Sequence, residues 1–327
     1  MTVHSSCRSK GIVVGALCIA AALPLFPVGD TGVVEAAFPG RNGRIAFQAF
    51  MGAPSSPVVD ADIFTVKEDG GGLHQITTGP ELDCWPKWSP DGDSIAFVRR
   101  TLWASGNETP GDVFLASDEG IANLTNTPTA AEFAPSWSPD GTQLAFSSDR
   151  SGLPRSPHDL YVMNVDTGSV QPLVEAPGDQ TDPTWSPDGR WIAYLDNFRS
   201  LELISTSGGR TRSLAAARRA GVLEFPDWSP DGTRIAFDAV RNVETGRPSA
   251  DIWVIGIDGD GLTKLTQSGA DDFGPSWSPD GKEIAFLSDR GEYRKLYTMR
   301  SDGTRPLPVL DIEVGAAGCP PSWGPTT

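Results

Sequence analysis

Acidic side chains recur a few residues ahead of five tryptophans in this chain. A carboxylate in a loop or pocket can act as a general acid or base, ligate a hard cation such as Ca²⁺, or bind a basic group of a partner. A sixth stretch, GAAGCPPSW around Trp323, lacks a carboxylate. The five acidic positions are Asp83 in ELDCWPKW, Glu132 in AAEFAPSW, Asp182 in GDQTDPTW, Glu224 in VLEFPDW and Asp272 in GADDFGPSW.

Histidine and cysteine supply little further chemistry. His74 falls in an expected outer strand (GLHQIT) and His158 stands beside Asp159 at a loop end, so we interpret both as surface residues. The sequence contains no H-E-x-x-H motif, no C-x-x-C pair and no G-x-S-x-G elbow. We therefore assign no catalytic residue and expect no metal centre and no cofactor, with a Ca²⁺ ion at the acidic positions as the alternative.

The tryptophans belong to an internal repeat that must position these carboxylates. The pentapeptide WSPDG begins at Trp88, Trp137, Trp185, Trp228 and Trp277, so its copies are 49, 48, 43 and 49 residues apart. This spacing suits one supersecondary unit per repeat and is far too long for a coiled coil. With 36 Gly and 28 Pro, the chain is also poorly suited to long helices.

Each pentapeptide is expected to form a hairpin turn between two strands. Proline fixes φ, aspartate accepts local backbone hydrogen bonds, and glycine takes the positive φ that closes the turn. The strand after the turn is apolar, as in SIAFV, QLAFS, WIAYL, RIAFD and EIAFL. A third strand follows in most units, and a polar turn then leads to a short fourth strand such as HQIT or TKLT. Four antiparallel strands in 43 to 49 residues describe one propeller blade.

The two ends of the chain predict the blade count. RNGRIAF at residues 41–47 resembles the second half of the motif, and the missing tryptophan half appears as PSWGP at residues 321–325. We therefore predict an all-β fold, a six-bladed β-propeller of four-stranded antiparallel blades, closed by N- and C-terminal strands that share one blade. Filling the wedge between blades is then the expected role of Trp88, Trp137, Trp185, Trp228, Trp277 and Trp323, with carbohydrate stacking as the alternative.

Two cysteines occupy matching places in the repeat. Cys84 and Cys319 each stand four residues before a motif tryptophan, in blades that the predicted closure makes neighbours. A disulfide between them would staple the ring in an oxidising compartment. The alternative is that inner strands of adjacent blades hold the α-carbons more than about 7 Å apart, which leaves both thiols free.

Two of the repeats carry a family resemblance. PSWSPDGTQLAFSSDRSG (135–152) and PSWSPDGKEIAFLSDRGEY (275–293), each followed by a Leu-Tyr strand, resemble repeats of TolB-like six-bladed β-propellers, and the resemblance extends over about residues 40–325. It implies a propeller fold. The protein that names the family is a periplasmic scaffold whose propeller contacts a peptidoglycan-associated lipoprotein, and it carries an α/β domain ahead of the propeller. Related propellers gate prolyl oligopeptidases or act as polysaccharide lyases.

The N-terminal segment predicts export. Arg8 and Lys10 precede an apolar run at residues 11–28, and small or aliphatic residues stand before a cut ahead of Ala37. We interpret residues 1–36 as a signal peptide and residues 37–327 as the propeller, with an uncleaved anchor as the alternative. The expected product is periplasmic or secreted, and it does not insert into the membrane once the signal is removed.

Charge and motif together favour a binding protein. The formal net charge of -16 argues against nucleic acid or an anionic bilayer as partner and favours a soluble monomer. Our hypothesis is a non-catalytic scaffold that binds a protein or peptide with a basic or polar segment at its channel mouth, through the five acidic positions. The alternative is an extracellular carbohydrate- or peptide-acting enzyme, a lyase or hydrolase, that uses the same carboxylates. The Ser-Asp-Arg triplets at residues 148–150 and 288–290 are interpreted as turn-shaping.

Overall fold

The computed structural model describes residues 40–50, 61–101, 110–151, 158–241, 249–291, 293–314 and 319–326. All of these residues belong to one unit of the chain, Val33–Thr327. The predicted signal peptide, residues 1–36, lies outside the described residues. Within the described ranges, no helix combines the length and the apolar character that a membrane crossing requires.

The WSPDG sequences form hairpin turns, as their chemistry predicts. In the first of them, Ser89 N–H donates to Ser94 O over 2.8 Å and Gly92 N–H donates to Ser89 O over 3.0 Å. Asp91 accepts a hydrogen bond from Ser89 Oγ, and Gly92 takes a φ of 78°, a conformation that favours glycine. The other four copies repeat these bonds, so each turn joins a tryptophan strand to an apolar strand.

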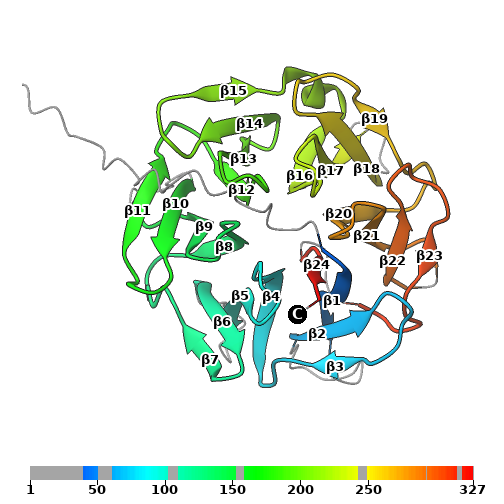
Figure 1. Ribbon diagram of the computed structural model, residues 1–327, viewed down its shortest axis with the longest axis horizontal. Coiled ribbons are helices and arrows are strands. Elements are labelled where there is room, and N and C mark those ends of the chain that lie inside the picture. Colours follow the sequence, from blue (N-terminus) through cyan, green and yellow to red (C-terminus); the bar gives the residue numbers. More distant parts are fainter. Residues whose placement is uncertain are drawn as a thin grey trace, which may run out of the picture. The chain divides into compact units, whose positions relative to one another are not determined.

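Four sheets contain four antiparallel strands each, in chain order from the tryptophan strand outward (Figure 1). A short 3-10 helix, η1 (Ala215–Arg219), separates the second sheet from the third. These sheets confirm the prediction of four-stranded propeller blades. Their strands are β8 (Glu132–Trp137), β9 (Gln143–Ser148), β10 (Asp159–Asn164) and β11 (Val170–Val174); β12 (Gln180–Trp185), β13 (Trp191–Asp196), β14 (Ser200–Ser205) and β15 (Thr211–Ser213); β16 (Val222–Trp228), β17 (Arg234–Arg241), β18 (Ser249–Gly256) and β19 (Thr263–Lys264); and β20 (Asp272–Trp277), β21 (Glu283–Ser288), β22 (Lys295–Arg300) and β23 (Leu307–Pro308).

The remaining strands form one eight-stranded sheet, in the order β24-β1-β2-β4-β5-β6-β7 with β3 beside β2. Strand β24 pairs antiparallel with β1, with Trp323 opposite Ile45. Strands β2 and β4 meet in a parallel pairing at Ala61 and Leu82. The strands are β1 (Asn42–Phe50), β2 (Ala61–Lys67), β3 (His74–Gln75), β4 (Glu81–Trp88), β5 (Ile95–Thr101), β6 (Asp112–Ser117), β7 (Gly120–Asn123) and β24 (Ser322–Pro325).

The core lies between adjacent sheets. The apolar strands have buried residues in succession, because both of their faces are covered. One cluster joins Val98 of β5 with Trp137 of β8 and Phe146 of β9, so neighbouring sheets share a core. The phenylalanine of the apolar strand is fully buried at Phe47, Phe97, Phe146, Phe237 and Phe286. Burying one such side chain contributes about 1.5–3 kcal/mol.

Candidate functional site

A bulge interrupts each of the five tryptophan strands β4, β8, β12, β16 and β20. In β12, for example, the pairing with β13 shifts register between Thr181 and Thr184. One residue at each bulge takes a left-handed conformation, and a proline follows it. Proline has no backbone N–H group, so it suits a position that makes no hydrogen bond to the neighbouring strand. These bulge residues are Trp85, Ala134, Asp182, Phe225 and Gly274, with φ of 52°, 52°, 52°, 49° and 62°.

Four of the five bulge residues line one narrow cavity, which we call the channel mouth. Trp85, Lys87, Ala134, Asp182 and Phe225 line it together with prolines that follow the bulges. Its volume is about 20 Å³, room for one or two water molecules. The mouth therefore combines two aromatic side chains, one carboxylate and one ammonium group.

A second cavity, with a volume of about 60 Å³, is lined by five of the six motif tryptophans (all except Trp88) and by the residues directly before the motif tryptophans. Several of these preceding side chains fasten one tryptophan strand to the next. Ser136 Oγ accepts a hydrogen bond from Trp185 N–H over 3.2 Å, and Ser276 Oγ accepts one from Trp323 N–H over 3.0 Å. The preceding residues are Lys87, Ser136, Thr184, Asp227, Ser276 and Ser322.

The motif tryptophans pack against the preceding sheet. Trp137 Nε1 donates to Lys87 O over 3.1 Å, and Trp228 Nε1 donates to Thr184 O over 3.0 Å. Four of the six tryptophans are buried and two are half-buried. The buried ones are Trp137, Trp228, Trp277 and Trp323, and the half-buried ones are Trp88 and Trp185.

One ion pair joins β4 to β16 across these cavities. Lys87 Nζ lies 3.7 Å from Asp227 Oδ1. Asp227 also accepts a hydrogen bond from Trp277 N–H over 2.8 Å. In other repeats the residue that accepts this hydrogen bond is a serine. Burial raises the pKa of Asp227, and the Lys87 ammonium opposes that rise. Lys87 is the one basic residue among the described residues that line either cavity.

Three of the five predicted acidic residues do not form a free acidic surface. Asp83 makes a bidentate pair with Arg99 on the adjacent strand, with both N–O distances 2.7 Å. Asp272 accepts from Arg290 Nη2 over 2.7 Å and from Ser288 Oγ. Both carboxylates are almost completely buried. An arginine of the same sheet therefore holds each of these carboxylates, and their predicted role in partner binding stays a prediction.

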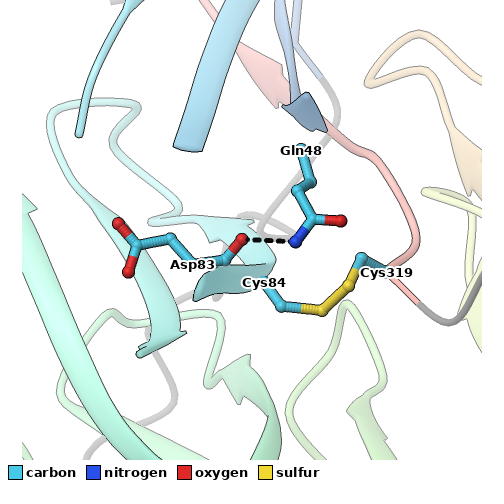
Figure 2. The surroundings of a disulfide bond; sticks show 4 residues. All are labelled: Gln48, Asp83, Cys84 and Cys319. Carbon is cyan, nitrogen blue, oxygen red and sulfur yellow. Dashed lines mark hydrogen bonds between the residues drawn. A yellow bond between two sulfur atoms is a disulfide. The ribbon is translucent and has the colours of Figure 1, made fainter. Parts of the chain in front are cut away.

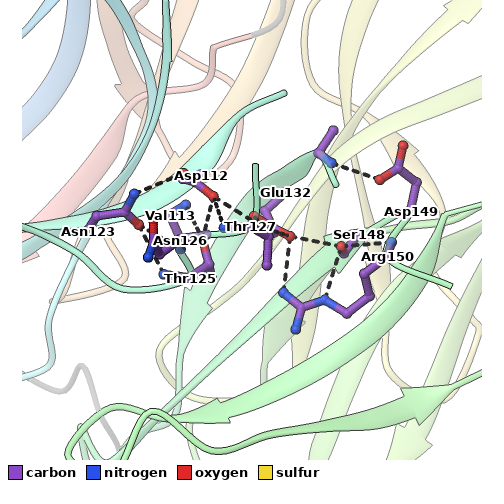
Figure 3. A network of polar contacts seen from close by, with 11 residues as sticks. Asp112, Val113, Asn123, Thr125, Asn126, Thr127, Glu132, Ser148, Asp149 and Arg150 are labelled. Carbon is purple, nitrogen blue, oxygen red and sulfur yellow. Dashed lines mark hydrogen bonds and ion pairs between the residues drawn. The ribbon is translucent and has the colours of Figure 1, made fainter. Parts of the chain in front are cut away.

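Glu132 is the third such carboxylate, and Figure 3 shows the network around it. Arg150 Nη2 donates to it over 3.1 Å, and the hydroxyl groups of Ser148 and Thr127 donate as well. Burial raises the pKa of Glu132, although Thr127 and Arg150 favour its charged form. Asp149 accepts a hydrogen bond from Ala131 N–H over 2.7 Å.

The second Ser-Asp-Arg triplet repeats this arrangement. Asp289 accepts a hydrogen bond from Asp271 N–H over 2.8 Å, as Asp149 does from Ala131. The Arg290 guanidinium lies 4.9 Å from the ring centroid of Tyr297. In both triplets the aspartate holds a loop backbone and the arginine holds a buried carboxylate, so the turn-shaping interpretation is confirmed.

The other two predicted carboxylates lie close to a third that the sequence did not reveal. Asp182 lines the channel mouth, and Glu224 is half-buried opposite Asp238 in the register of β16 and β17. Burial, with a smaller contribution from nearby Glu224, raises the pKa of Asp182 to about 7. Burial also raises the pKa of Glu224 and raises that of Asp238 well above its usual range.

Asp238 was missed because only one repeat carries it. It directly follows the IAF sequence of β17, where the other repeats place an uncharged residue. A carboxylate at a position that is otherwise uncharged was the signal that could have revealed it. The equivalent residues are Gln48, Val98, Ser147, Leu195 and Leu287.

A disulfide joins Cys84 of β4 to Cys319, just before β24 (Figure 2). The α-carbons lie 5.4 Å apart, within the reach of a disulfide. Gln48 Nε2 on β1 donates to Asp83 O over 2.8 Å beside the disulfide, while the Asp83 carboxylate points away from it. The disulfide and this hydrogen bond tie β4 to both ends of the described chain.

The two histidines differ in their surroundings. His74 is exposed, as predicted. His158 is half-buried, with Nδ1 3.0 Å from Asp179 Oδ1 and its ring 4.8 Å from that of Phe133. Among the residues with described positions, no group of three or more His, Cys, Asp and Glu side chains is arranged to hold a metal ion.

Comparison with known proteins settles the family. The family model described as the TolB beta propeller domain matches residues 120–200 and 199–310, which is more than half of the chain. The chain belongs to the TolB β-propeller family. Among curated proteins no match to this TolB-family chain was found.

Two solved structures with TM-scores above 0.5 support the fold of this TolB-family chain. TolB from Acinetobacter baumannii is similar with a TM-score of 0.70 and 22% identity, over 87% of this chain and 67% of that one. A chain of the nidogen/laminin complex is similar with a TM-score of 0.51 and 10% identity, over 71% of this chain and 79% of that one. An oligogalacturonate lyase in complex with manganese has a TM-score of 0.47 and 14% identity, over 82% of this chain and 74% of that one.

Proposed function

We propose that this protein is an exported, monomeric, non-catalytic propeller that binds a segment of a partner protein at the channel mouth and needs no cofactor. The observation that carries the proposal is the mouth itself. Asp182 and the aromatic rings of Trp85 and Phe225 line a cavity of about 20 Å³, whereas small-molecule sites usually enclose about 300–1,000 Å³. A peptide can cover such a mouth from outside, but a substrate has little room to enter it.

The proposal includes six blades, of which one combines strands from both ends of the described chain. The pairing of β24 with β1 and the disulfide support this count. Successive tryptophan strands contact one another, and β24 contacts both β20 and β4. A Cβ added to Gly324 would lie 2.4 Å from Trp88 Cγ, so the close packing of β24 on β4 requires glycine there.

The disulfide supports export, and the net charge supports the proposed partner class and the monomeric state. The disulfide between Cys84 and Cys319 suits an oxidising compartment. The net charge of -16 disfavours nucleic acid and anionic bilayers as partners and keeps single chains apart by repulsion. A protein or peptide with a basic or polar segment is the partner class that complements this charge.

The test is affinity capture from envelope and secreted fractions of the producing cell, with the purified protein as bait. The variant Trp85→Ala/Phe225→Ala removes the aromatic lining of the mouth. The matched control, Ile121→Ala/Leu307→Ala, removes two apolar side chains that are 42% and 62% exposed on outer strands. We expect a partner that the wild type and the control capture and the mouth variant loses. Capture of the same proteins by all three baits would refute the mouth as the binding site.

A further inference from the structure

One stretch of this acidic chain is basic. Residues 199–219 contain five arginines and a single acidic residue, Glu202, although the whole chain has a formal net charge of -16. All five arginines are exposed. Positive charge is therefore segregated on one part of the surface. The arginines are Arg199, Arg210, Arg212, Arg218 and Arg219.

Two of the arginines belong to β15, the edge strand of its sheet (Figure 1). Arg212 lies opposite Leu203 of β14, and a hydrogen bond from Ser205 N–H to Arg210 O extends this pairing. Because alternate residues of a strand share a face, Arg210 and Arg212 are on the same side as Leu203. Leu203 packs in one buried cluster with Ala217 of η1. These two arginines therefore lie on the side of β15 that adjoins η1.

The helix η1 adds two arginines and reaches the fifth. A 3-10 helix has three residues per turn, so every third residue shares one face, and here that face is buried. Arg218 and Arg219 lie outside it and are exposed. Arg218 Nε donates to Ser200 Oγ over 2.8 Å, which holds η1 beside the turn that carries Arg199. The residues of the buried face are Leu214, Ala217 and Ala220.

Acidic residues do not neutralise this surface. In the described part of the chain, no carboxylate forms an ion pair with Arg199, Arg210 or Arg212. Glu202 accepts a hydrogen bond from Ser213 Oγ over 2.8 Å, on the opposite face of the sheet from Arg212. The arginines of residues 199–219 are therefore available to an anionic partner. Exposed cations elsewhere are paired, Arg190 with Asp188 and Lys282 with Asp280.

The composition of this surface narrows the class of partner. Residues 199–219 contain no aromatic residue, and the exposed large apolar side chains of the described chain lie elsewhere. Protein partners are usually anchored by such side chains, and single-stranded nucleic acid stacks on aromatic ones. A duplex or a bilayer is broad and would bring its charge against the acidic surroundings. Protection of an edge strand would explain arginines on β15 but not those of η1.

We propose that β15, η1 and the turn before β14 form a strip that binds a linear anionic polysaccharide through its five arginines. A guanidinium group offers a fork of donors that matches carboxylates and other oxyanions. The three residues of β15 and the five of η1 account for about 20 Å of chain path, enough for several anionic groups in series. The strip is three strands away from the tryptophan strand β12, so it is separate from the channel mouth and goes beyond the proposed function.

The experiment is a fluorescence anisotropy titration of labelled oligosaccharides with the purified protein at low ionic strength. The probes are alginate, which carries carboxylates, heparin, which carries sulfates, and neutral dextran. We expect at least one of the two anionic probes to bind, and dextran to bind at least tenfold more weakly. The probe that binds identifies the anionic group. Binding of neither anionic probe, or equal binding of dextran, would overturn the strip, and this comparison needs no variant.

Variants locate the binding. The triple variant Arg199→Gln/Arg210→Gln/Arg212→Gln removes three exposed charges from the strip and is expected to weaken binding of the anionic probe at least tenfold. The control Lys282→Gln/Arg300→Gln/Arg305→Gln makes the same charge change at exposed positions of another sheet and is expected to leave binding unchanged. Equal weakening by both variants, or none by the triple variant, would refute the strip. Melting curves check that the variants are folded.

Competition distinguishes a polysaccharide from other polyanions. Poly-L-glutamate and a short DNA duplex are titrated against the bound anionic probe at equal concentrations of negative charge. We expect unlabelled oligosaccharide to displace the probe at least tenfold more effectively than either competitor. Displacement by poly-L-glutamate or by the duplex at the same concentration would refute a polysaccharide as the partner of these arginines.

Discussion

Aspartate side chains ahead of the tryptophans differ in their charge environment, because some of them face an arginine and others do not. Asp83 is buried but has a guanidinium fork 2.7 Å away, which supplies two charge-assisted hydrogen bonds. Asp182, at the bulge of β12, is buried without such a partner, so the cost of desolvation falls on its charged form. An acidic residue ahead of a tryptophan is thus ion-paired with an arginine of its own sheet in one repeat and has no arginine partner in another.

Asp182 should make stability depend on pH in a defined direction. Its pKa is raised from 3.8 to about 7, so the native state holds a proton that the unfolded state releases. The free energy of unfolding therefore falls as pH rises between about 4 and 7. We expect Asp182→Asn to raise it at pH 8, by up to about 4 kcal/mol, and to have no effect at pH 4. Asparagine also tolerates the left-handed backbone at this position.

Urea unfolding of the wild type and Asp182→Asn across this pH range measures the effect. The neighbouring charged groups are Glu224 and Asp238, which repel the charged form, and Lys87, which favours it. Asp118→Asn, at an exposed site, serves as the control. A constant difference between Asp182→Asn and wild type at all pH values would contradict the assignment of the proton to Asp182.

At the scale of elements, the tryptophan strands are coupled through the residue before each tryptophan. Where that residue is serine, its hydroxyl group accepts the next tryptophan's N–H, as with Ser136, Ser276 and Ser322. Asp227 does the same for Trp277 and also reaches Lys87 on β4. Asp227 therefore links β16 to the neighbouring strand β20 and, through the ion pair with Lys87, to β4, which is not its neighbour.

A double-mutant cycle tests that link. Lys87→Met leaves Asp227 without its counter-ion, and Asp227→Ser keeps an acceptor for Trp277 but leaves Lys87 unpaired. Each single variant should lower the free energy of unfolding by about 3 kcal/mol, because one buried charge loses its partner. The double variant should cost clearly less than the sum of the two. Additive losses in chemical denaturation would mean that the two residues do not stabilise each other.

Much of the element level could be predicted from sequence, for reasons that particular residues make clear. Ser89 and Gly92 form the expected turn because its chemistry is local. The left-handed bulge residues were not predicted, although a proline after each of them was a visible signal. The partner of Glu132 was also missed, because Arg150 lies 18 residues away and only the hairpin register brings it near.

At the scale of the whole molecule, one disulfide spans 235 residues of sequence. Closing so long a loop restricts the unfolded chain strongly, which in the entropic model stabilises the native state by about 2–5 kcal/mol. We expect Cys84→Ser/Cys319→Ser, or reduction of the wild type, to lower the free energy of unfolding by that amount. Hydrogen exchange should show the largest loss of protection in β24 and β1. Uniform loss over all sheets would contradict a local role at this junction.

The pairing of β24 with β1 also imposes an order in time on the making of this protein. Until residues 319–325 have been synthesised, β1 has an open edge, Trp88 is uncovered on the side of Gly324, and Cys84 cannot form its disulfide with Cys319. A nascent chain therefore cannot complete its fold sheet by sheet as it emerges from the ribosome. Its eight-stranded sheet stays incomplete until β24 has been made, so this sheet closes only after the strands of the other four sheets have been synthesised.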